Sequence, residues 1–430
     1  MTHSVNPPRQ IECGALFSPV RDMIARILPF ALLSFALFAG GCSNSSPTAE
    51  ADIGSELPPP ILGVTASTDA SIKAPPIPAP PQVPAKGYYL IDYRTNQVLA
   101  AHNENERLEP ASLTKLMTGY AVFHALKDGR IRLDDRVRIS PYARSQEGSR
   151  MFVEVGSMVS VENLIRGMTV QSGNDATVAL AEHVAGSEPV FVDLMNQYAQ
   201  QLGMTSTHFQ NSPGMPGPEH YTTARDIAIL TSALIRDYLD YYKYYSEREF
   251  TWNKITQPNR NGLLYRGPSV DGLKTGHTES AGYCLVSSAE RDGMRLVSVV
   301  MGAPSVRARE DASAALLNYG FGFYQTRKLY TAGQPLLTLP VWKGEADSVI
   351  LSVPEDVYAT IPRGQETSLN VAADIAEPLI APIATESPLG KLRIILGDAT
   401  LATYPMHAQA QVSEAGFFGR LIDDVKLWMQ

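Results

Sequence analysis

Residues 109–120 read Glu-Pro-Ala-Ser-Leu-Thr-Lys-Leu-Met-Thr-Gly-Tyr, and this stretch decides the fold of the chain. Pro110 precedes a run of apolar residues at helical spacing, so we predict a helix with proline near its first turn. Residues three apart share one face of a helix. Ser112 and Lys115 are therefore expected to lie side by side.

This pair suits nucleophilic catalysis. A serine hydroxyl is a weak nucleophile until a neighbouring base takes its proton, and lysine can be that base only when burial or nearby positive charge lowers its pKa. We therefore predict Ser112 as nucleophile and Lys115 as base, with the N–H groups of the helix start available to an oxyanion. Taken alone, S-x-x-K is more typical of a helix start followed by an exposed lysine.

A second motif, Ser172-Gly173-Asn174, comes just before another helical run. A polar loop at a helix start can direct hydroxyl and amide groups into a cleft. We expect Ser172 to relay protons and Asn174 to hydrogen-bond the substrate. Asp175 is predicted to cap the helix.

The third motif is Lys274-Thr275-Gly276, followed by the apolar stretch AGYCLVS at 281–287. This pattern predicts a strand that lines a cleft, where Gly276 allows close approach and Lys274 and Thr275 offer donors to an anion. Lys274 would also be the positive charge beside Lys115. We interpret His277 as structural, since a lone histidine beside a strand more often is.

The set S-x-x-K, S-x-N and K-T-G, in this order, resembles that of penicillin-binding proteins and serine β-lactamases. The stretches around these motifs, together with NRNGLLY at 259–265 and VVMGAPSVRARED at 299–311, resemble the D-alanyl-D-alanine carboxypeptidases of the peptidase S11 family. The similarity runs from about residue 87 to the C-terminus. Ala303-Pro304 departs from the Gly-Arg that family members often carry.

The resemblance implies an α/β (α+β) fold of the penicillin-binding, serine β-lactamase-like type. Helices would cover an antiparallel five-stranded sheet, followed by a small all-β sandwich domain. It implies an acyl-enzyme on Ser112, with Arg309 helping to hold the substrate's terminal carboxylate and Arg260 as another arginine near the site. The substrate would be the peptidoglycan pentapeptide stem, which loses its terminal D-alanine, and β-lactam antibiotics would be inhibitors.

Three rival functions can be weighed from the residues. A class A β-lactamase needs a glutamate in an E-x-x-x-N context to activate the deacylating water, and neither Glu182, Glu188 nor Glu219 stands in one. A non-catalytic peptidoglycan-binding protein is disfavoured because every motif residue is intact. An endopeptidase that cuts cross-links remains an open alternative.

The two ends of the chain suggest an envelope location. We predict a signal peptide at 1–42, with an apolar core at 27–40. Its end, Ala39-Gly40-Gly41-Cys42, resembles a bacterial lipobox that would make Cys42 a lipid attachment site; ordinary cleavage is the alternative. After the signal peptide we expect four segments: a Pro/Ser/Ala-rich linker at 43–86, a catalytic domain at 87–334, an all-β domain at 335–412 and an amphipathic helix at 416–430.

The composition limits partners and cofactors. The formal net charge is −8, which offers no electrostatic reason for nucleic-acid binding. The three cysteines, Cys13, Cys42 and Cys284, show no metal-ligand spacing, and no phosphate-binding loop is present. We expect no metal or organic cofactor. The expected location is the periplasmic face of the inner membrane, with the helix at 416–430 lying on the membrane surface. The alternative is that this helix docks on its own β-domain, and its adjacent acids, Asp423 and Asp424, weaken attraction to anionic lipid.

Overall fold

The computed structural model describes residues 77–267 and 269–429. The predicted signal peptide, Cys42 and most of the predicted linker lie outside the described residues. Within these two ranges, no helix combines the length and the apolar character needed to cross a bilayer.

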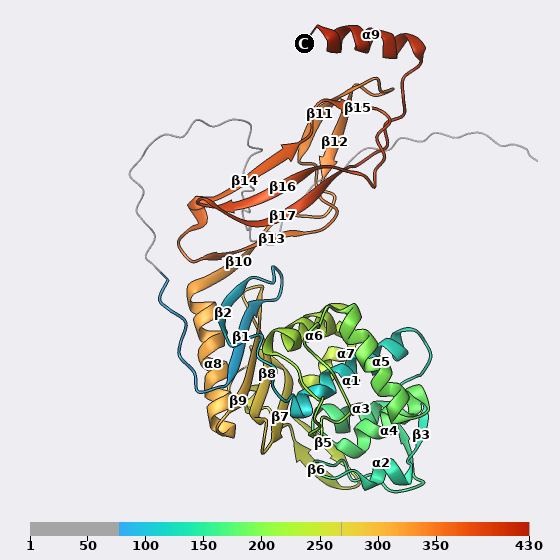
Figure 1. The fold of residues 1–430 in the computed structure, drawn as a ribbon, viewed down its shortest axis with the longest axis vertical. Helices are drawn as coiled ribbons and strands as arrows, with labels where there is room; N and C mark the ends of the chain where they lie inside the picture. The colour runs from blue at the N-terminus through green and yellow to red at the C-terminus, as the bar shows by residue number, and fades with distance from the viewer. Residues whose placement is uncertain (1–76, 268, 430) are drawn as a thin grey trace, which may run out of the picture. The chain divides into compact units, whose positions relative to one another are not determined.

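Five antiparallel strands form the central sheet, in the spatial order β2–β1–β9–β8–β7. The helices cover one face and the long helix α8 covers the other (Figure 1). The strands are β1 (Gly87–Asp92), β2 (Val98–His102), β7 (Val270–Thr278), β8 (Gly282–Arg291) and β9 (Met294–Ala303).

Both faces of this sheet are buried, and the sequence of β1 shows how. Tyr89 and Ile91 pack into the cluster beneath the helices, whereas Tyr88 and Leu90 pack into the cluster beneath α8, which spans Val306–Phe323. Successive side chains of a strand point to opposite faces. A continuous run of apolar residues in one strand therefore packs into a hydrophobic core on each face of the sheet.

The helical layer lies between β2 and β7 in the chain and brings the first two motifs to the edge of the sheet. It also contains two short pairs of antiparallel strands, β3–β4 and β5–β6. The bounds are η1 (Ala111–Thr114), α1 (Lys115–Lys127), β3 (Arg136–Arg138), α2 (Pro141–Ser145), β4 (Met158–Ser160), α3 (Val161–Thr169), α4 (Asn174–Ala185), α5 (Glu188–Gln201), α6 (Ala224–Asp237), α7 (Leu239–Tyr242), η2 (Lys243–Tyr245), β5 (Glu249–Trp252), β6 (Ile255–Pro258) and η3 (Gly262–Tyr265).

The last ten residues of the predicted linker lie against the domain. Ile77, Val83 and Ala85 pack on the cluster beneath α8, and the hydroxyl of Tyr319 donates to the carbonyl of Pro78 at 3.1 Å. The apolar side chains among the prolines explain this packing. The Pro-rich composition had led us to predict a linker over these residues.

A β-rich C-terminal domain follows α8 directly, with its own apolar core. Its first strand starts before the predicted boundary at 335 and pairs with β13. A six-stranded sheet has the order β14–β16–β17–β12–β11–β15. The bounds are β10 (Tyr324–Tyr330), β11 (Leu337–Trp342), β12 (Ser348–Ser352), β13 (Val357–Pro362), η4 (Glu366–Ser368), β14 (Leu369–Ile375), β15 (Leu379–Ile380), β16 (Pro388–Leu396) and β17 (Ala399–Ala408).

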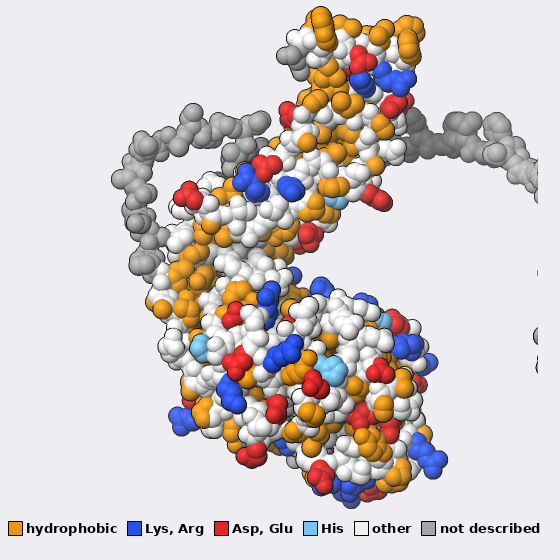
Figure 2. All heavy atoms as spheres, in the orientation of Figure 1, with side chains coloured by type: hydrophobic (Ala, Val, Ile, Leu, Met, Phe, Trp, Pro, Cys, Tyr) orange, Lys and Arg blue, Asp and Glu red, His pale blue; other side chains and the backbone are white. Residues whose placement is uncertain are grey.

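The last helix, α9 (Phe417–Trp428), buries none of its residues. Hydrophobic side chains crowd its exposed surface (Figure 2). Those exposed over more than half of their surface are Phe417, Phe418, Leu421, Ile422, Val425, Trp428 and the adjacent Met429.

Candidate active site

The serine of the first motif lies on the short turn η1, which leads directly into α1. Ala111, just before Ser112, has a φ of +47°, a conformation that costs energy for a residue with a side chain. Gly214 supports this turn from the opposite loop: a Cβ on Gly214 would lie 1.9 Å from the Ala111 carbonyl oxygen. The nucleophile turn is therefore held by close backbone packing.

Lys115 lies beneath Ser112 with three partners. Its Nζ is 3.1 Å from Ser112 Oγ, 2.7 Å from Asn174 Oδ1 and 2.6 Å from the Pro213 carbonyl oxygen. A neutral amine has two N–H bonds and one lone pair. Because the two carbonyl oxygens accept the N–H bonds, the lone pair is left to face the Ser112 hydroxyl. This geometry suits proton abstraction.

The environment of Lys115 favours the neutral amine. Burial and, to a smaller extent, the Arg260 guanidinium together lower the pKa of Lys115 to about 7, against the opposing effect of Asp175. We expected Lys274 to be the neighbouring positive charge. Arg260 is a second one, and its charge lowers the pKa of Lys115. The pKa of Lys274 itself is lowered well below its ordinary value by burial and by Lys115, Arg260 and Arg309.

Ser172 and Lys274 form a second hydroxyl–amine pair in the same cleft. Lys274, on β7, donates to Ser172 Oγ at 2.9 Å and to the Thr275 carbonyl at 3.0 Å. Ser172 has a φ of +64° and ends the turn between α3 and α4. The pair joins the sheet edge to the helical layer, at the place where a proton relay would be needed.

Asn174 is the first residue of α4, and its amide is engaged within the protein. Its carbonyl accepts from Lys115, and its NH₂ group donates to the Glu147 carbonyl at 2.6 Å. We expected Asn174 to bind the substrate. It lines the cleft, but its polar atoms already orient the base.

The structure corrects the position of the expected helix cap: the cap residue of α4 is Gly173, and Asp175 lies within the first turn. The buried Asp175 carboxylate accepts one N–H of that turn, from Ala176 at 2.9 Å. It also accepts backbone N–H groups from Met151 at 2.8 Å, Phe152 at 2.8 Å and Val153 at 3.2 Å. A carboxylate has enough acceptor sites for such a set. Asp175 thus anchors the loop that forms one rim of the cleft.

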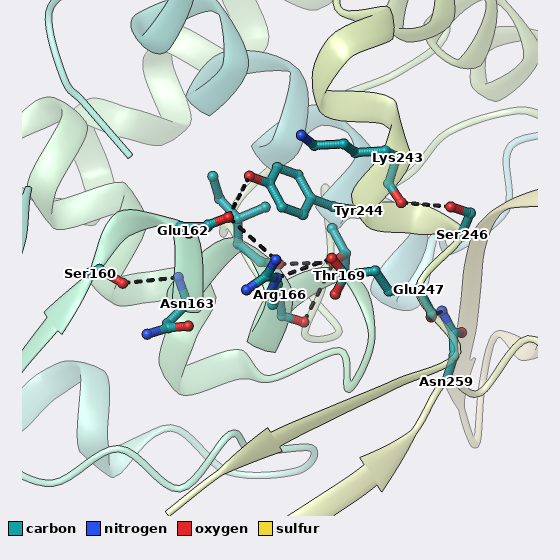
Figure 3. Close-up of polar contacts among 11 residues, drawn as sticks. Ser160, Glu162, Asn163, Arg166, Thr169, Lys243, Tyr244, Ser246, Glu247 and Asn259 are labelled. Atoms are coloured by element: carbon teal, nitrogen blue, oxygen red, sulfur yellow. Dashed lines mark hydrogen bonds and ion pairs between the residues drawn. The ribbon is translucent and has the colours of Figure 1, made fainter. Parts of the chain in front are cut away.

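A polar network behind α3 fixes the segment that carries Arg260. Arg166 pairs with Glu247 at 3.0 Å and with Glu162 at 3.3 Å, as Figure 3 shows. Asn259 donates to the Glu247 carbonyl at 2.9 Å. Arg260 follows immediately and reaches the cleft, where its side chain stays accessible to solvent.

Arg309, on α8, lines the cleft next to the Arg260 backbone. It is buried, and its guanidinium makes only long bonds: 3.3 Å to the Gly276 carbonyl, 3.4 Å to the Arg260 carbonyl and 3.5 Å to the Cys284 carbonyl. Its Nε has no partner among the described residues. A buried cation with spare donors attracts an anion into the cleft.

These groups surround a single cleft of about 660 Å³. Seven of the predicted residues line it, and Lys115 and Lys274 are buried within hydrogen-bonding distance of its serines. The residues that line the cleft are Ser112, Gly148, Ser149, Ser172, Asn174, Gly214, Met215, Arg260, Thr275, Gly276, His277, Thr278, Tyr283, Val306 and Arg309.

Sequence reasoning missed two loops of this lining. Gly148 and Ser149 lie in the loop that Asp175 anchors, and Gly214 and Met215 lie in the loop that contacts Lys115. Both are short stretches of small or flexible residues without a motif. The available signal was the Gly and Pro content of 213–218, which indicates a turn and no chemistry.

The cleft is electropositive. Within the part of the chain that the structure describes, no carboxylate lines it, and no group of His, Cys, Asp or Glu residues could hold a metal ion. A serine beside a lysine base, with a second serine–lysine pair and two arginines, defines a serine hydrolase suited to an anionic acyl substrate.

Comparison with known proteins places this hydrolase in a family. The model of the D-alanyl-D-alanine carboxypeptidase family, peptidase S11, matches residues 74–305. The model of the penicillin-binding protein 5 C-terminal domain matches residues 324–414. The chain therefore belongs to the peptidase S11 family and is a D-alanyl-D-alanine carboxypeptidase.

Individual relatives agree with this assignment. The D-alanyl-D-alanine carboxypeptidase DacA of Escherichia coli K12 is 43% identical over 359 residues, which cover 82% of this chain and 89% of the relative. The crystal structure of penicillin-binding protein 5 from Haemophilus influenzae is 44% identical, with a TM-score of 0.76, and covers 78% of this chain and 99% of that chain. Penicillin-binding protein D2 of Listeria monocytogenes, in its ampicillin-bound form, is 29% identical, with a TM-score of 0.50, and covers 56% and 98%.

Proposed function

We propose that the chain removes the terminal D-alanine of peptidoglycan pentapeptide stems through an acyl-enzyme on Ser112. The observation that carries this proposal is the contact of Lys115 Nζ with Ser112 Oγ at 3.1 Å while two carbonyl oxygens hold its N–H bonds. Lys115 takes the hydroxyl proton as Ser112 Oγ attacks the carbonyl carbon between the two D-alanines. The peptide C–N bond then breaks, and water later hydrolyses the ester.

Two other parts of the site serve this reaction. Ser172, which accepts a hydrogen bond from Lys274, relays a proton to the leaving amine of D-alanine. Arg309 and Arg260, together with Thr275, attract the terminal carboxylate, because a free carboxylate is what distinguishes a stem end from a peptide bond inside a chain. The carboxylate assignment follows from the positive charge of the two arginines, and the Ser172 assignment follows from its hydrogen bond with Lys274.

The direct test is incubation with a pentapeptide that ends in D-Ala-D-Ala, with free D-alanine as the readout. We expect release by the wild-type protein and none by Ser112→Ala. A cross-linked dimer, tested in parallel, separates this activity from an endopeptidase activity. Faster cleavage of the dimer than of the pentapeptide would contradict the carboxypeptidase assignment.

We also propose that β-lactams acylate Ser112, since their strained amide presents the same carbonyl to the same cleft. The ampicillin-bound relative from Listeria monocytogenes supports this. Among the described residues that line the cleft there is no carboxylate. A class A β-lactamase needs a glutamate there to activate the deacylating water, so efficient deacylation by that route is not expected.

The helix α9 is proposed to lie on the membrane surface. Its apolar residues are exposed, with Trp428 at 87% and Phe418 at 78%, and an exposed apolar stripe of this size is typical of an interfacial helix. The two acids of α9 face elsewhere: Asp423 accepts the Lys343 backbone N–H at 2.7 Å and Asp424 pairs with the Lys343 side chain. This pairing reduces the repulsion between these acids and anionic lipid.

The location proposed for the protein is the periplasmic face of the inner membrane. Cys42, in its lipobox-like context, is proposed as a second attachment point. Mass spectrometry of the protein purified from membranes checks this: an N-terminal lipidated Cys42 supports the proposal, and an unmodified N-terminus contradicts it.

A further inference from the structure

Glu188 is a buried carboxylate that the reaction described above does not use. It is the first residue of α5, only 7% exposed, and its Oε1 accepts both the N–H of Ser212 at 2.9 Å and the hydroxyl of Ser212 at 2.7 Å. Its Oε2 accepts the hydroxyl of Tyr142 at 2.5 Å. Burying a carboxylate is costly unless such bonds offset the cost, so the position of Ser212 is strongly determined.

The residue after Ser212 contacts the catalytic base. The carbonyl of Pro213 lies 2.6 Å from Lys115 Nζ, and the carbonyl of Ser212 accepts from Thr118 Oγ1, one turn further along α1, at 2.7 Å. The segment 212–213 therefore lies against the nucleophile helix, with Glu188 behind it. Proline has no N–H of its own. The Pro213 carbonyl is therefore held by its neighbours: the Ser212 N–H donates to Glu188 at 2.9 Å, and the Gly214 N–H donates to Asn211 Oδ1 at 2.8 Å.

The opposite end of the same loop is held by His220. Its Nδ1 accepts the N–H of Gln210 at 3.0 Å, which leaves the proton on Nε2 for Thr114 Oγ1 at 2.8 Å. Burial lowers the pKa of His220 to about 4, so this neutral tautomer persists through the working pH range. His220 thus holds Gln210 and Asn211 holds Gly214, and Glu188 fixes Ser212, the residue directly before Pro213, between them.

We propose that Glu188 is a positioning residue for the base: through Ser212 it holds the Pro213 carbonyl on Lys115, and so directs the lysine lone pair at Ser112. With this carbonyl displaced, only Asn174 Oδ1 orients the amine, which can then rotate about its own axis. The inference rests on the proposed role of Lys115. It adds a residue whose side chain does not touch the substrate.

The test compares Glu188→Ala, Glu188→Gln and the matched control Tyr142→Phe by the pH dependence of acylation with penicillin. Glutamine retains a carbonyl oxygen with two acceptor sites for Ser212, and Tyr142→Phe removes only the Oε2 partner. We expect Glu188→Ala to lower the plateau rate by about tenfold to a hundredfold, as a misplaced catalytic group does. The other two variants should keep rates close to wild type.

The midpoint of the pH profile separates positioning from loosened structure. The Pro213 carbonyl stabilises the charged lysine, so its loss lowers the pKa of Lys115 and moves the midpoint to lower pH. A site that merely opened to water would regain solvation and move the midpoint upward. The titratable and charged groups around Lys115, which are Lys274, Arg260 and Asp175, are unchanged in all variants.

The outcomes are decisive in either direction. An upward or unchanged midpoint in a folded Glu188→Ala protein overturns the proposal, as does an equal shift in Glu188→Gln, which would show an effect of charge alone. If Glu188→Ala does not fold, Glu188→Asp replaces it, since the shorter acid draws Ser212 away and keeps the charge. Absence of acylation in the wild-type protein would instead refute the role of Ser112 and Lys115.

Discussion

At the scale of single residues, the account depends on the protonation state of Lys115. Its pKa of about 7 lies far below that of an exposed lysine because the amine is buried beside Arg260. Above pH 7 the amine is neutral and can accept the Ser112 proton; below pH 7 it is protonated and cannot. The second-order rate of penicillin acylation should therefore rise with pH and reach half its plateau near pH 7. A rate that is flat between pH 5 and 9, or that falls with rising pH, contradicts this.

The substitution Lys115→Arg tests the same point without removing charge. Arginine does not deprotonate in proteins, so we expect acylation to fall by about a hundredfold or more. Circular dichroism and thermal unfolding serve as the control for folding. Near-normal acylation by this variant would mean that another group is the base.

Gly214 gives a stability prediction at this scale. Gly214→Ala adds a Cβ at 1.9 Å from the Ala111 carbonyl oxygen, at a φ of +87°. Gly129→Ala is the matched control, since its φ is +71° and no atom lies within 4 Å of the added Cβ. We expect a loss of about 1 kcal/mol in the control and about 1–3 kcal/mol beyond that in Gly214→Ala. If the two variants had equal unfolding free energies, the close contact between residue 214 and Ala111 would not contribute to stability.

At the scale of elements, Asp175 links α4 to the rim of the cleft. Asp175→Ala leaves the backbone N–H groups of Met151, Phe152 and Val153 without their acceptor, which should cost on the order of 3 kcal/mol and should also slow acylation. Asp193→Ala, at an exposed position of α5, is the control. An unfolding free energy that matches the control would remove Asp175 as the anchor of this loop.

The sequence predicted the elements that carry motifs better than it predicted their connections. Helical spacing and the three motifs placed Ser112, Ser172 and Lys274 in one cleft, because each motif occurs at the end or edge of a regular element. The roles of Asp175, Glu188 and Pro213 could not be predicted, since each acts through hydrogen bonds between loops that are distant in sequence. Such contacts leave no periodic pattern.

At the scale of the whole molecule, membrane binding by α9 is the testable feature. Full-length protein without lipid should co-sediment with anionic vesicles, and a truncation before residue 416 should not. Leu421→Glu should weaken binding in the same way. Val190→Glu, on an exposed apolar position of α5, is the matched control and should bind normally. Equal partitioning of the full and truncated chains would end the proposal.

Changes in residue composition and periodicity along the chain predicted the order of its domains, but they did not predict the residues at which the domains begin. The C-terminal domain starts at β10, Tyr324–Tyr330, because these residues pair with β13, a partner that no local pattern reveals. The packing of residues 77–85 was hidden by the surrounding prolines for the same reason. Contacts between residues distant in sequence therefore determine both the start of the C-terminal domain and the packing of residues 77–85, and no local pattern shows such contacts.

The central claim is that Ser112 is the nucleophile of a D-alanyl-D-alanine carboxypeptidase. Peptide mapping by mass spectrometry after brief exposure to penicillin tests it most directly. We predict one penicilloyl adduct, on the peptide that contains Ser112, and its absence when the protein is first saturated with a D-Ala-D-Ala pentapeptide. An adduct on another residue, or one that persists in Ser112→Ala, would contradict the account.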